Sequence, residues 1–305
     1  PLFIPENMEH RMTNLGVDIV RIGTGELAKC WLGVPMLEGE RIRGVIAVQS
    51  IKREHVFSER DRDLIMSIAS QTAISLQNAS LFRQTQEQNA ELAILNEMGR
   101  ELSAQFSLDG VASVVYAFTG RLMDVTDFFI SIYHPEKEQI SFPLVYFDGK
   151  QTTLDRVDVG NGLTAKIIHD KIPVFLPDRV EERFRELGVE FVKVGDDDQA
   201  KCWLGVPLMF GETVLGTITV QSTVSENLYN EHDRDLLVAI AGQAAIALQK
   251  AQLFEETSKF KMGIERSGDA IFMTDLTGKI IYTNPAFTQI YGFTNEDALG
   301  KTPRI

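Results

Sequence analysis

Short runs of β-branched and aliphatic residues alternate along the chain with long segments of helical spacing. Residues 202–209 and 213–222 are rich in Val, Leu, Ile and Thr, and a Gly-Glu turn separates them. Residues 129–133 and 140–147 repeat this arrangement around a His-Pro-Glu-Lys turn. Two strand-like runs joined by a short turn predict a β-hairpin. We therefore expect an α+β fold with antiparallel sheets flanked by helices.

A helical pattern follows the second strand of each repeated pair. Each helix begins at a capping residue, Ser58 or Asn230, and carboxylates in the first turn complement the free N–H groups and the helix dipole. Near-continuous helices are predicted over residues 58–106 and 230–264. The first contains a seam whose spacing alternates four and three, namely Leu81, Thr85, Gln88, Leu92, Leu95, Gly99, Leu102 and Phe106.

Five of these eight seam positions are apolar, which is typical of a coiled coil. The same phase recurs in the second helix, at Leu253, Thr257, Phe260 and Ile264. We therefore expect a parallel homodimer with long helices along its axis. The alternative is that each helix packs only on its own sheet.

The chain contains an internal repeat. Residues 29–85 align without a gap on residues 201–257, and 31 of these 57 positions are identical at a constant offset of 172. The register extends to PLFIP at residue 1, which matches PVFLP at Pro173. The second copy continues upstream to about residue 90, so we expect the chain to be a fragment that begins inside its first domain.

Length and composition narrow the class of protein. A chain of 305 residues is expected to form more than one domain. Its net charge of −13 repels phosphate backbones, which argues against nucleic-acid binding. We find no apolar run long enough for a membrane segment, and the only cysteines, Cys30 and Cys202, lack the spacing of a zinc site. A reducing cytoplasm is the expected compartment.

Both repeats resemble GAF domains, the small-molecule-sensing modules of bacterial signalling proteins. The resemblance rests on WLGVP followed by a turn, the G-[TV]-[IA]-V-Q-S strand and the helix motif Q-[AT]-A-I-[AS]-L-[QN]. The second copy adds residues 160–164 and 173–178, which resemble the middle of that family. This implies an N-terminally truncated GAF domain at 1–85, a helical linker at 86–106, a complete GAF domain at 107–252 and a second linker at 253–264.

Residues 265–305 resemble the first half of a PAS domain through the run D-x-x-G-x-I-x-x-x-N-x-A-F. Gly278 supplies a turn between two strands, and Asn284 caps a helix with Pro285 at its first position. Gly292 ends that helix. The implied PAS domain is C-terminally truncated, and its cofactor is unknown.

Tandem GAF domains followed by a PAS domain occur in bacterial sensor histidine kinases and diguanylate cyclases. The resemblance implies a regulatory fragment that senses a small molecule and relays the signal to an output domain, with a histidine kinase favoured over a diguanylate cyclase. The alternative is a GAF dimerisation spacer that binds no ligand.

We expect no catalysis by this fragment, because GGDEF, P-loop and Ser-His-Asp motifs are absent from its sequence. His232 precedes an acidic residue, as a kinase phosphoacceptor does, but no proline follows it and Arg60 replaces it in the other copy. We interpret it as a surface residue of the first helical turn. A methionine sulfoxide reductase of the GAF type needs several cysteines in one domain, and each copy has one.

The ligand-binding face depends on the hairpin register. A two- or four-residue turn pairs Cys202 with Gln221 and puts Cys202, Thr217 and Thr219 on one face, while a three-residue loop reverses this. The opposite face, which includes Trp203 and Ile218, would pack under the terminal helices. Cysteine in a strand is usually an inert small hydrophobe.

The predicted pocket lies between the face that bears Thr217 and Thr219 and the segment 160–188. The candidate ligand-binding residues are Tyr133, Phe142, Asp178, Arg179, Cys202, Thr217 and Thr219. They combine apolar walls with a few polar anchors, as small-molecule sites do. The alternative, a pocket filled by its own side chains, remains open.

Overall fold

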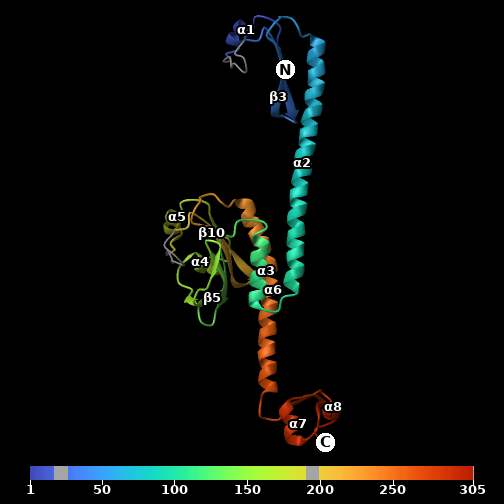
Figure 1. The fold of residues 1–305 in the computed structure, drawn as a ribbon, viewed down its shortest axis with the longest axis vertical. Helices are drawn as coiled ribbons and strands as arrows, with labels where there is room; N and C mark the ends of the chain where they lie inside the picture. The colour runs from blue at the N-terminus through green and yellow to red at the C-terminus, as the bar shows by residue number, and fades with distance from the viewer. Residues whose placement is uncertain (17–26, 190–198, 305) are drawn as a thin grey trace. The chain divides into compact units, whose positions relative to one another are not determined.

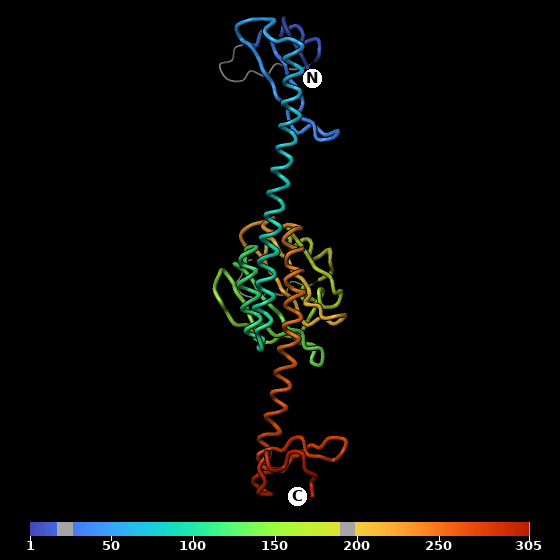
Figure 2. Tube along the Cα trace, turned by 90° about the vertical axis from the view of Figure 1, so that its right-hand side faces the viewer, coloured from blue at the N-terminus to red at the C-terminus, as the bar shows by residue number. Residues whose placement is uncertain are grey.

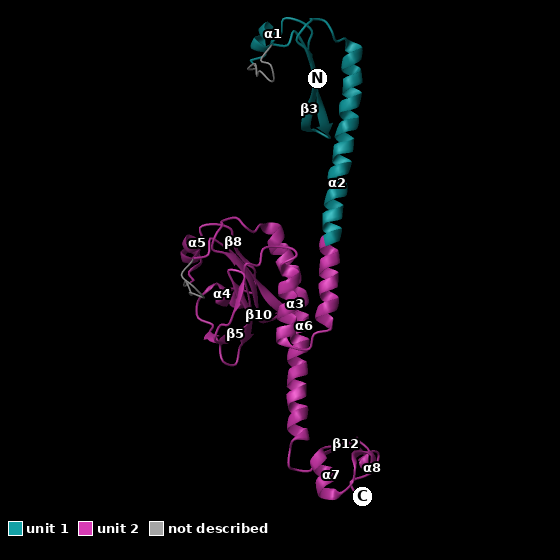
Figure 3. Ribbon diagram, in the orientation of Figure 1, with its two compact units in different colours: residues 1–90 teal, residues 91–305 magenta. Residues whose placement is uncertain are grey.

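The computed structural model describes residues 1–16, 27–189 and 199–304. The chain divides into two compact units, residues 1–90 and residues 91–305 (Figure 3). Helix α2 (Glu59–Ser103) belongs to both units, because the boundary falls within it.

The first unit contains a three-stranded antiparallel sheet in the order β1-β2-β3. Its elements are β1 (Leu2–Ile4), α1 (Met8–Asn14), β2 (Cys30–Glu38), β3 (Arg41–Ser50) and the beginning of α2. Leu32 and Val34 of β2 are buried against Ala69 of α2, so the helix covers one face of this sheet.

The second unit contains a larger antiparallel sheet in the order β6-β5-β4-β10-β9-β8, with β7 paired to β5. The strands are β4 (Asp127–His134), β5 (Gln139–Phe147), β6 (Lys150–Thr152), β7 (Val157–Asp158), β8 (Val174–Leu176), β9 (Cys202–Phe210) and β10 (Thr213–Ser222). Both expected hairpins, β4-β5 and β9-β10, are confirmed. The α+β fold with antiparallel sheets is therefore confirmed as well.

Helices cover both faces of this sheet (Figure 1, Figure 2). Helix α3 (Leu108–Thr119) and helix α6 (Glu231–Glu265) pack on what we call the outer face, and the last turns of α2 contribute Met98 and Leu102 to the same core. Helices α4 (Leu163–Asp170) and α5 (Val180–Leu187) lie on the opposite, inner face, where they pack around Trp203. Burial of aliphatic side chains between the helices and the outer face forms the main core.

Helix α6 begins where the sequence predicts. The Asn230 side chain accepts hydrogen bonds from the backbone of His232 and Asp233, and the Asp233 carboxylate accepts the Asn230 N–H. This reciprocal capping box satisfies N–H groups that the first helical turn leaves free. Ser58 and Asp61 exchange equivalent hydrogen bonds at the start of α2, so the expected capping is confirmed in both repeats.

One helix is more apolar than we expected from the sequence. Helix α6 is long and apolar enough, by length and composition alone, to cross a membrane, and it is the one such helix in the described ranges. Nine of its residues are buried in the domain: Leu236, Leu237, Ile240, Ala241, Ala244, Ala245, Ala247, Leu248 and Ala251. The high hydropathy of α6 is therefore largely explained by these residues, which pack in the core of the domain.

The predicted coiled-coil seam is divided between two environments. Leu102 is buried in the core of the second unit, and Leu95 packs against the same core. Leu81 and Leu92 are exposed. Helix α2 therefore does not pack only on its own sheet, as the alternative interpretation had it, because the seam positions near its end join the core of the second unit. Leu81 and Leu92 are free of that core.

The register of β9 with β10 differs from our expectation. The turn has two residues, yet Cys202 pairs with Ser222, and Trp203 pairs with Gln221. A β-bulge at Leu215 inserts one extra residue into β10 and shifts all later pairs by one position. The predicted pairing is therefore wrong: Cys202 lies on the outer face, and Thr217 and Thr219 lie on the inner face with Trp203.

The repeat is visible element by element. Strands β1, β2 and β3 correspond to β8, β9 and β10 at the offset of 172 residues, and α2 begins 172 residues before α6. The bulge also recurs, because Arg43 is left unpaired in β3 as Leu215 is in β10. Lys29 and Lys201 donate their backbone N–H to Ser50 and Ser222 over the same distance, 2.7 Å.

The last segment contains β11 (Phe272–Thr274), β12 (Ile280–Thr283), α7 (Pro285–Tyr291) and α8 (Asn295–Ala298). The Asn284 side chain accepts the Phe287 N–H, Pro285 opens the helix, and Gly292 ends it at φ 77°. These features of the predicted half-domain are confirmed.

Candidate ligand-binding site

Three buried hydroxyl side chains mark the inner face of the sheet in the second unit. Ser131 of β4 and Thr217 of β10 are paired across the strands, and their hydroxyl oxygens are 2.8 Å apart. Both are fully buried, so neither hydroxyl is exposed to water. This pair satisfies its own hydrogen-bonding needs.

Thr219 differs from its neighbour. It is also fully buried, but its hydroxyl has no hydrogen-bond partner in the described ranges. It pairs with Phe129 on one side and with Gly205 on the other. A β-carbon placed on Gly205 would lie 2.3 Å from the Trp203 ring and 2.7 Å from Ile167 of α4. The indole of Trp203 therefore lies directly on Gly205, beside Thr219.

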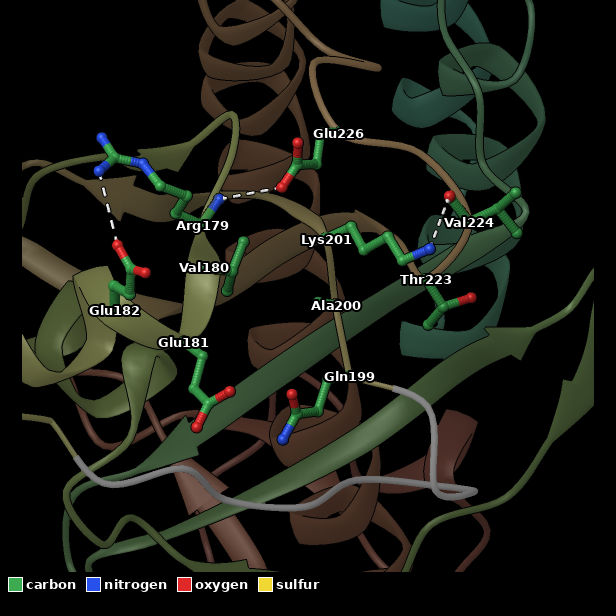
Figure 4. Close-up of a pocket in the computed structure, with 10 residues that line it drawn as sticks. All are labelled: Arg179, Val180, Glu181, Glu182, Gln199, Ala200, Lys201, Thr223, Val224 and Glu226. Carbon is green, nitrogen blue, oxygen red and sulfur yellow. Dashed lines mark hydrogen bonds and ion pairs between the residues drawn. The ribbon is translucent and has the colours of Figure 1, made fainter.

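A separate open pocket of about 730 Å³ lies between the start of α5, the residues just before β9 and the residues just after β10 (Figure 4). Two cations line it and point to opposite sides. Arg179 lies 3.5 Å from Glu182, while the Lys201 ammonium donates to the Val224 carbonyl oxygen at 3.1 Å. The other lining residues are Val180, Glu181, Gln199, Ala200, Thr223 and Glu226.

The predicted site residues fall into several places. Tyr133 lines a shallow pocket of about 310 Å³ together with His169. Phe142 packs edge-on against Phe129, with ring centroids 6.2 Å apart. Thr217 lies on the inner face, as Thr219 does. The structure therefore brings Phe142 to the ring that flanks Thr219, but it places Tyr133 in a different pocket.

Asp178 and Arg179 lie at the start of α5. Arg183 donates a 2.8 Å hydrogen bond to Asp178, and this bond lowers the pKa of the Asp178 carboxyl. Arg183 of α5 thus favours the ionised form of Asp178, which precedes the helix. Arg179 has a left-handed backbone with φ 44° and lines the pocket of Figure 4.

Cys202 does not join the other candidates. It is buried on the outer face among the residues that pack under α6, and burial raises the pKa of its thiol. A buried, protonated thiol is a poor nucleophile and a poor metal ligand. No group of three or more His, Cys, Asp or Glu side chains in the described ranges could hold a metal ion.

His232 lies in the first turn of α6, where the sequence places it, but it has a partner that the sequence did not reveal. Its Nε2 atom is 2.9 Å from a carboxylate oxygen of Glu91 in α2. This hydrogen bond is the main cause of a raised His232 pKa. The pair ties α2 to the start of α6.

Sequence reasoning also missed Ser131 and the position of the Trp203 ring. A signal for Ser131 was present, because a serine interrupts the otherwise apolar run Phe-Phe-Ile-Ser-Ile at the middle of β4. The spacing of Trp203 and Gly205 indicates that both lie on one face of a strand.

Comparison with protein families assigns the two C-terminal parts. Residues 107–249 match the GAF domain, and residues 258–305 match the PAS fold. The chain thus contains a GAF domain at its second repeat, followed by a PAS fold. Both are sensory modules, which supports a regulatory role in signal sensing.

Solved structures with similarity to this chain are distant in sequence. The GAF domain of an Acinetobacter phosphoenolpyruvate-protein phosphotransferase is 17% identical, with a TM-score of 0.45, and the match covers 54% of this chain and 96% of that one. Residues 122 to 287 of a methyl-accepting chemotaxis protein are 14% identical, with a TM-score of 0.41 and coverages of 53% and 99%. Free methionine-R-sulfoxide reductase from Neisseria meningitidis is 12% identical, with a TM-score of 0.41 and coverages of 53% and 90%. No curated protein matches the chain.

Proposed function

We propose that this chain is a regulatory part of a bacterial signal-transduction protein, in which the GAF domain binds a small molecule and helices α2 and α6 carry the response to an output domain. The observation that carries the proposal is that the two faces of one sheet have different roles. Its inner face holds the unpaired Thr219 hydroxyl, and its outer face packs on α6, which continues to Glu265. A ligand that favours one arrangement of sheet and helix shifts the population toward it.

We favour a histidine kinase as the output and keep a diguanylate cyclase as the alternative. We also propose that residues 1–85 form part of a further GAF domain, with helical linkers at 86–106 and 253–264. Support for the first domain comes from the strands, helix start and bulge that it shares with the second at one constant offset. Both cysteines are free and buried, which is consistent with the proposed cytoplasmic location.

A parallel homodimer is the second part of the proposal. Helix α6 presents an exposed apolar stripe, Val238, Ile246 and Leu253, which its own sheet leaves uncovered. The corresponding residues of α2, Met66, Ile74 and Leu81, are exposed too. Since both repeats carry the stripe at equivalent positions, a parallel partner could cover each stripe with its own copy.

Cysteine cross-linking tests the dimer. Ile246→Cys introduces a thiol at a position that is 63% exposed within the stripe, and Val224→Cys introduces one at an exposed position outside it. We expect disulfide-linked dimers with the first variant only, because the two native cysteines are buried. A chain that sediments as a monomer at micromolar concentration would contradict the proposal.

Native mass spectrometry and hydrogen exchange test the sensing role. Protein purified without denaturation should carry a co-purified small molecule, and its removal should change amide exchange in α6. The competing function is a dimerisation spacer, which the closed packing around Thr217 and Thr219 favours. Protein without bound mass, and with α6 exchange unaffected by cell metabolite extract, would support the spacer and refute sensing.

A further inference from the structure

The unpaired hydroxyl of Thr219 is not required by the fold. The first repeat builds the corresponding strand β3 with the same bulge, and it has Val45 and Ala47 where β10 has Thr217 and Thr219. Buried polar side chains without a partner are rare in native proteins. The hydroxyl therefore needs an explanation other than strand formation.

The neighbouring Trp203 and Gly205, by contrast, are common to both repeats. Trp31 lies on Gly33 as Trp203 lies on Gly205, and in each case a β-carbon on the glycine would collide with the indole. The absence of a side chain on Gly205 leaves a slot of about the size of one indole on the sheet. In this structure the indole of Trp203 fills the slot, beside Thr219, the residue that pairs with Gly205.

The surroundings of this slot define what else could occupy it. Phe129 and Ile167 form apolar walls, and the hydroxyls of Ser131, Thr217 and Thr219 are buried on the same face. Asp127, the first residue of β4, is also buried on this face, opposite Gln221, and its carboxylate accepts the Asp148 N–H at 2.8 Å. Burying an ionised ligand there would be unfavourable, because no Lys, Arg or His is buried in the described ranges and the Asp127 carboxylate is bonded to the Asp148 N–H at the start of β4. The site therefore suits a planar, uncharged molecule.

We propose that the GAF domain binds an uncharged, ring-sized ligand that displaces the indole of Trp203 from Gly205 and accepts a hydrogen bond from the Thr219 hydroxyl. This inference rests on the proposed sensing function and names the ligand class for it. The structure then represents the closed form, in which the protein's own ring occupies the slot. Ligand binding exchanges one ring for another and gives Thr219 its missing partner.

The test uses the full chain with Trp31→Phe, so that Trp203 is the sole tryptophan. The probes are acetophenone, an uncharged ring with one carbonyl acceptor, and benzoate, its anionic counterpart of similar size. We expect saturable red-shifted emission of Trp203 with acetophenone and none with benzoate. Thr219→Val should weaken acetophenone binding about fivefold, as the loss of one hydrogen bond predicts. The matched control is Thr213→Val at the exposed start of β10, which should bind as the parent does.

Three results would overturn the inference: no saturable emission change with acetophenone, equal binding of benzoate, or unchanged acetophenone binding by Thr219→Val. Circular dichroism of each variant establishes that it is folded. A failure of the ligand class is distinguishable from a failure of sensing. If acetophenone binds as expected but hydrogen exchange in α6 stays the same, the result supports the binding site and contradicts the signalling role.

Discussion

Two threonines separated by one residue on the same strand should respond in opposite directions to the same substitution. Thr217→Val removes one partner of the 2.8 Å hydrogen bond to Ser131 and leaves the buried Ser131 hydroxyl unpaired. An unsatisfied buried hydroxyl costs about 1–3 kcal/mol, so we expect destabilisation of that size. Thr219→Val replaces an already unpaired buried hydroxyl by a methyl group of similar shape. We expect it to stabilise the ligand-free domain by about 1 kcal/mol.

The assay is urea denaturation followed by Trp203 fluorescence in the Trp31→Phe chain, which reports on the GAF domain at residues 107–249 alone. For a domain of this size, 1 kcal/mol corresponds to a change of about 3 °C in the thermal midpoint, which gives an independent measurement. The double variant Ser131→Ala/Thr217→Val removes both partners and should recover most of the stability lost by Thr217→Val.

Equal destabilisation by the two single Thr→Val variants would refute this reasoning. It would mean that the Thr219 hydroxyl makes a favourable interaction in the free domain. A double variant no more stable than Thr217→Val would likewise show that an unpaired Ser131 hydroxyl does not destabilise the folded domain.

Two further predictions concern other parts of the same unit. Because Glu91 raises the pKa of His232, their pair should stabilise the fold below pH of about 6.5, and this contribution should vanish as the pH rises through the raised pKa. Glu91→Gln should therefore lower the His232 pKa in an NMR titration, and an unchanged value would disprove the linkage. Gly216→Ala should destabilise the domain by about 3 kcal/mol in urea, because its β-carbon would lie 1.8 Å from the Ser131 carbonyl oxygen. Gly242→Ala, in an open position on α6, serves as the control and should be neutral or stabilising.

The features that could be predicted from the sequence are those set by nearby residues. Asn230 and Asp233 cap α6 through contacts that span three positions, and Asn284 does the same for α7. The Gly-Glu turn between β9 and β10 was also predicted, although its length of two residues was not. Such elements need no knowledge of the rest of the molecule.

The register beyond that turn could not be predicted in this way. The bulge at Leu215 adjoins Gly216, whose backbone approaches β4 so closely that a side chain would overlap Ser131. This approach involves a strand some 80 positions earlier in the chain. One extra residue was enough to put Cys202 and Thr219 on opposite faces of the sheet, and so to change the composition of the expected site.

The candidate site depends on distant residues for the same reason. Thr217 and Ser131 are 86 positions apart, and His232 and Glu91 are 141 apart. When the residues are considered one at a time, the sequence does not show which of them are partners. Only the packing of strands and helices shows which of them are paired and that Thr219 is not.

Helix α6 buries residues as far as Ala251 and then continues without interruption to Glu265. Each residue in a helix advances the direction of the side chains by about 100°, so the exposed portion sets an angular phase for whatever follows. A one-residue insertion after Ala251 would leave the GAF core intact yet rotate the following chain by about that angle. Insertion of seven residues would restore the phase to within about 20°. Signal output plotted against insertion length should therefore oscillate rather than decay.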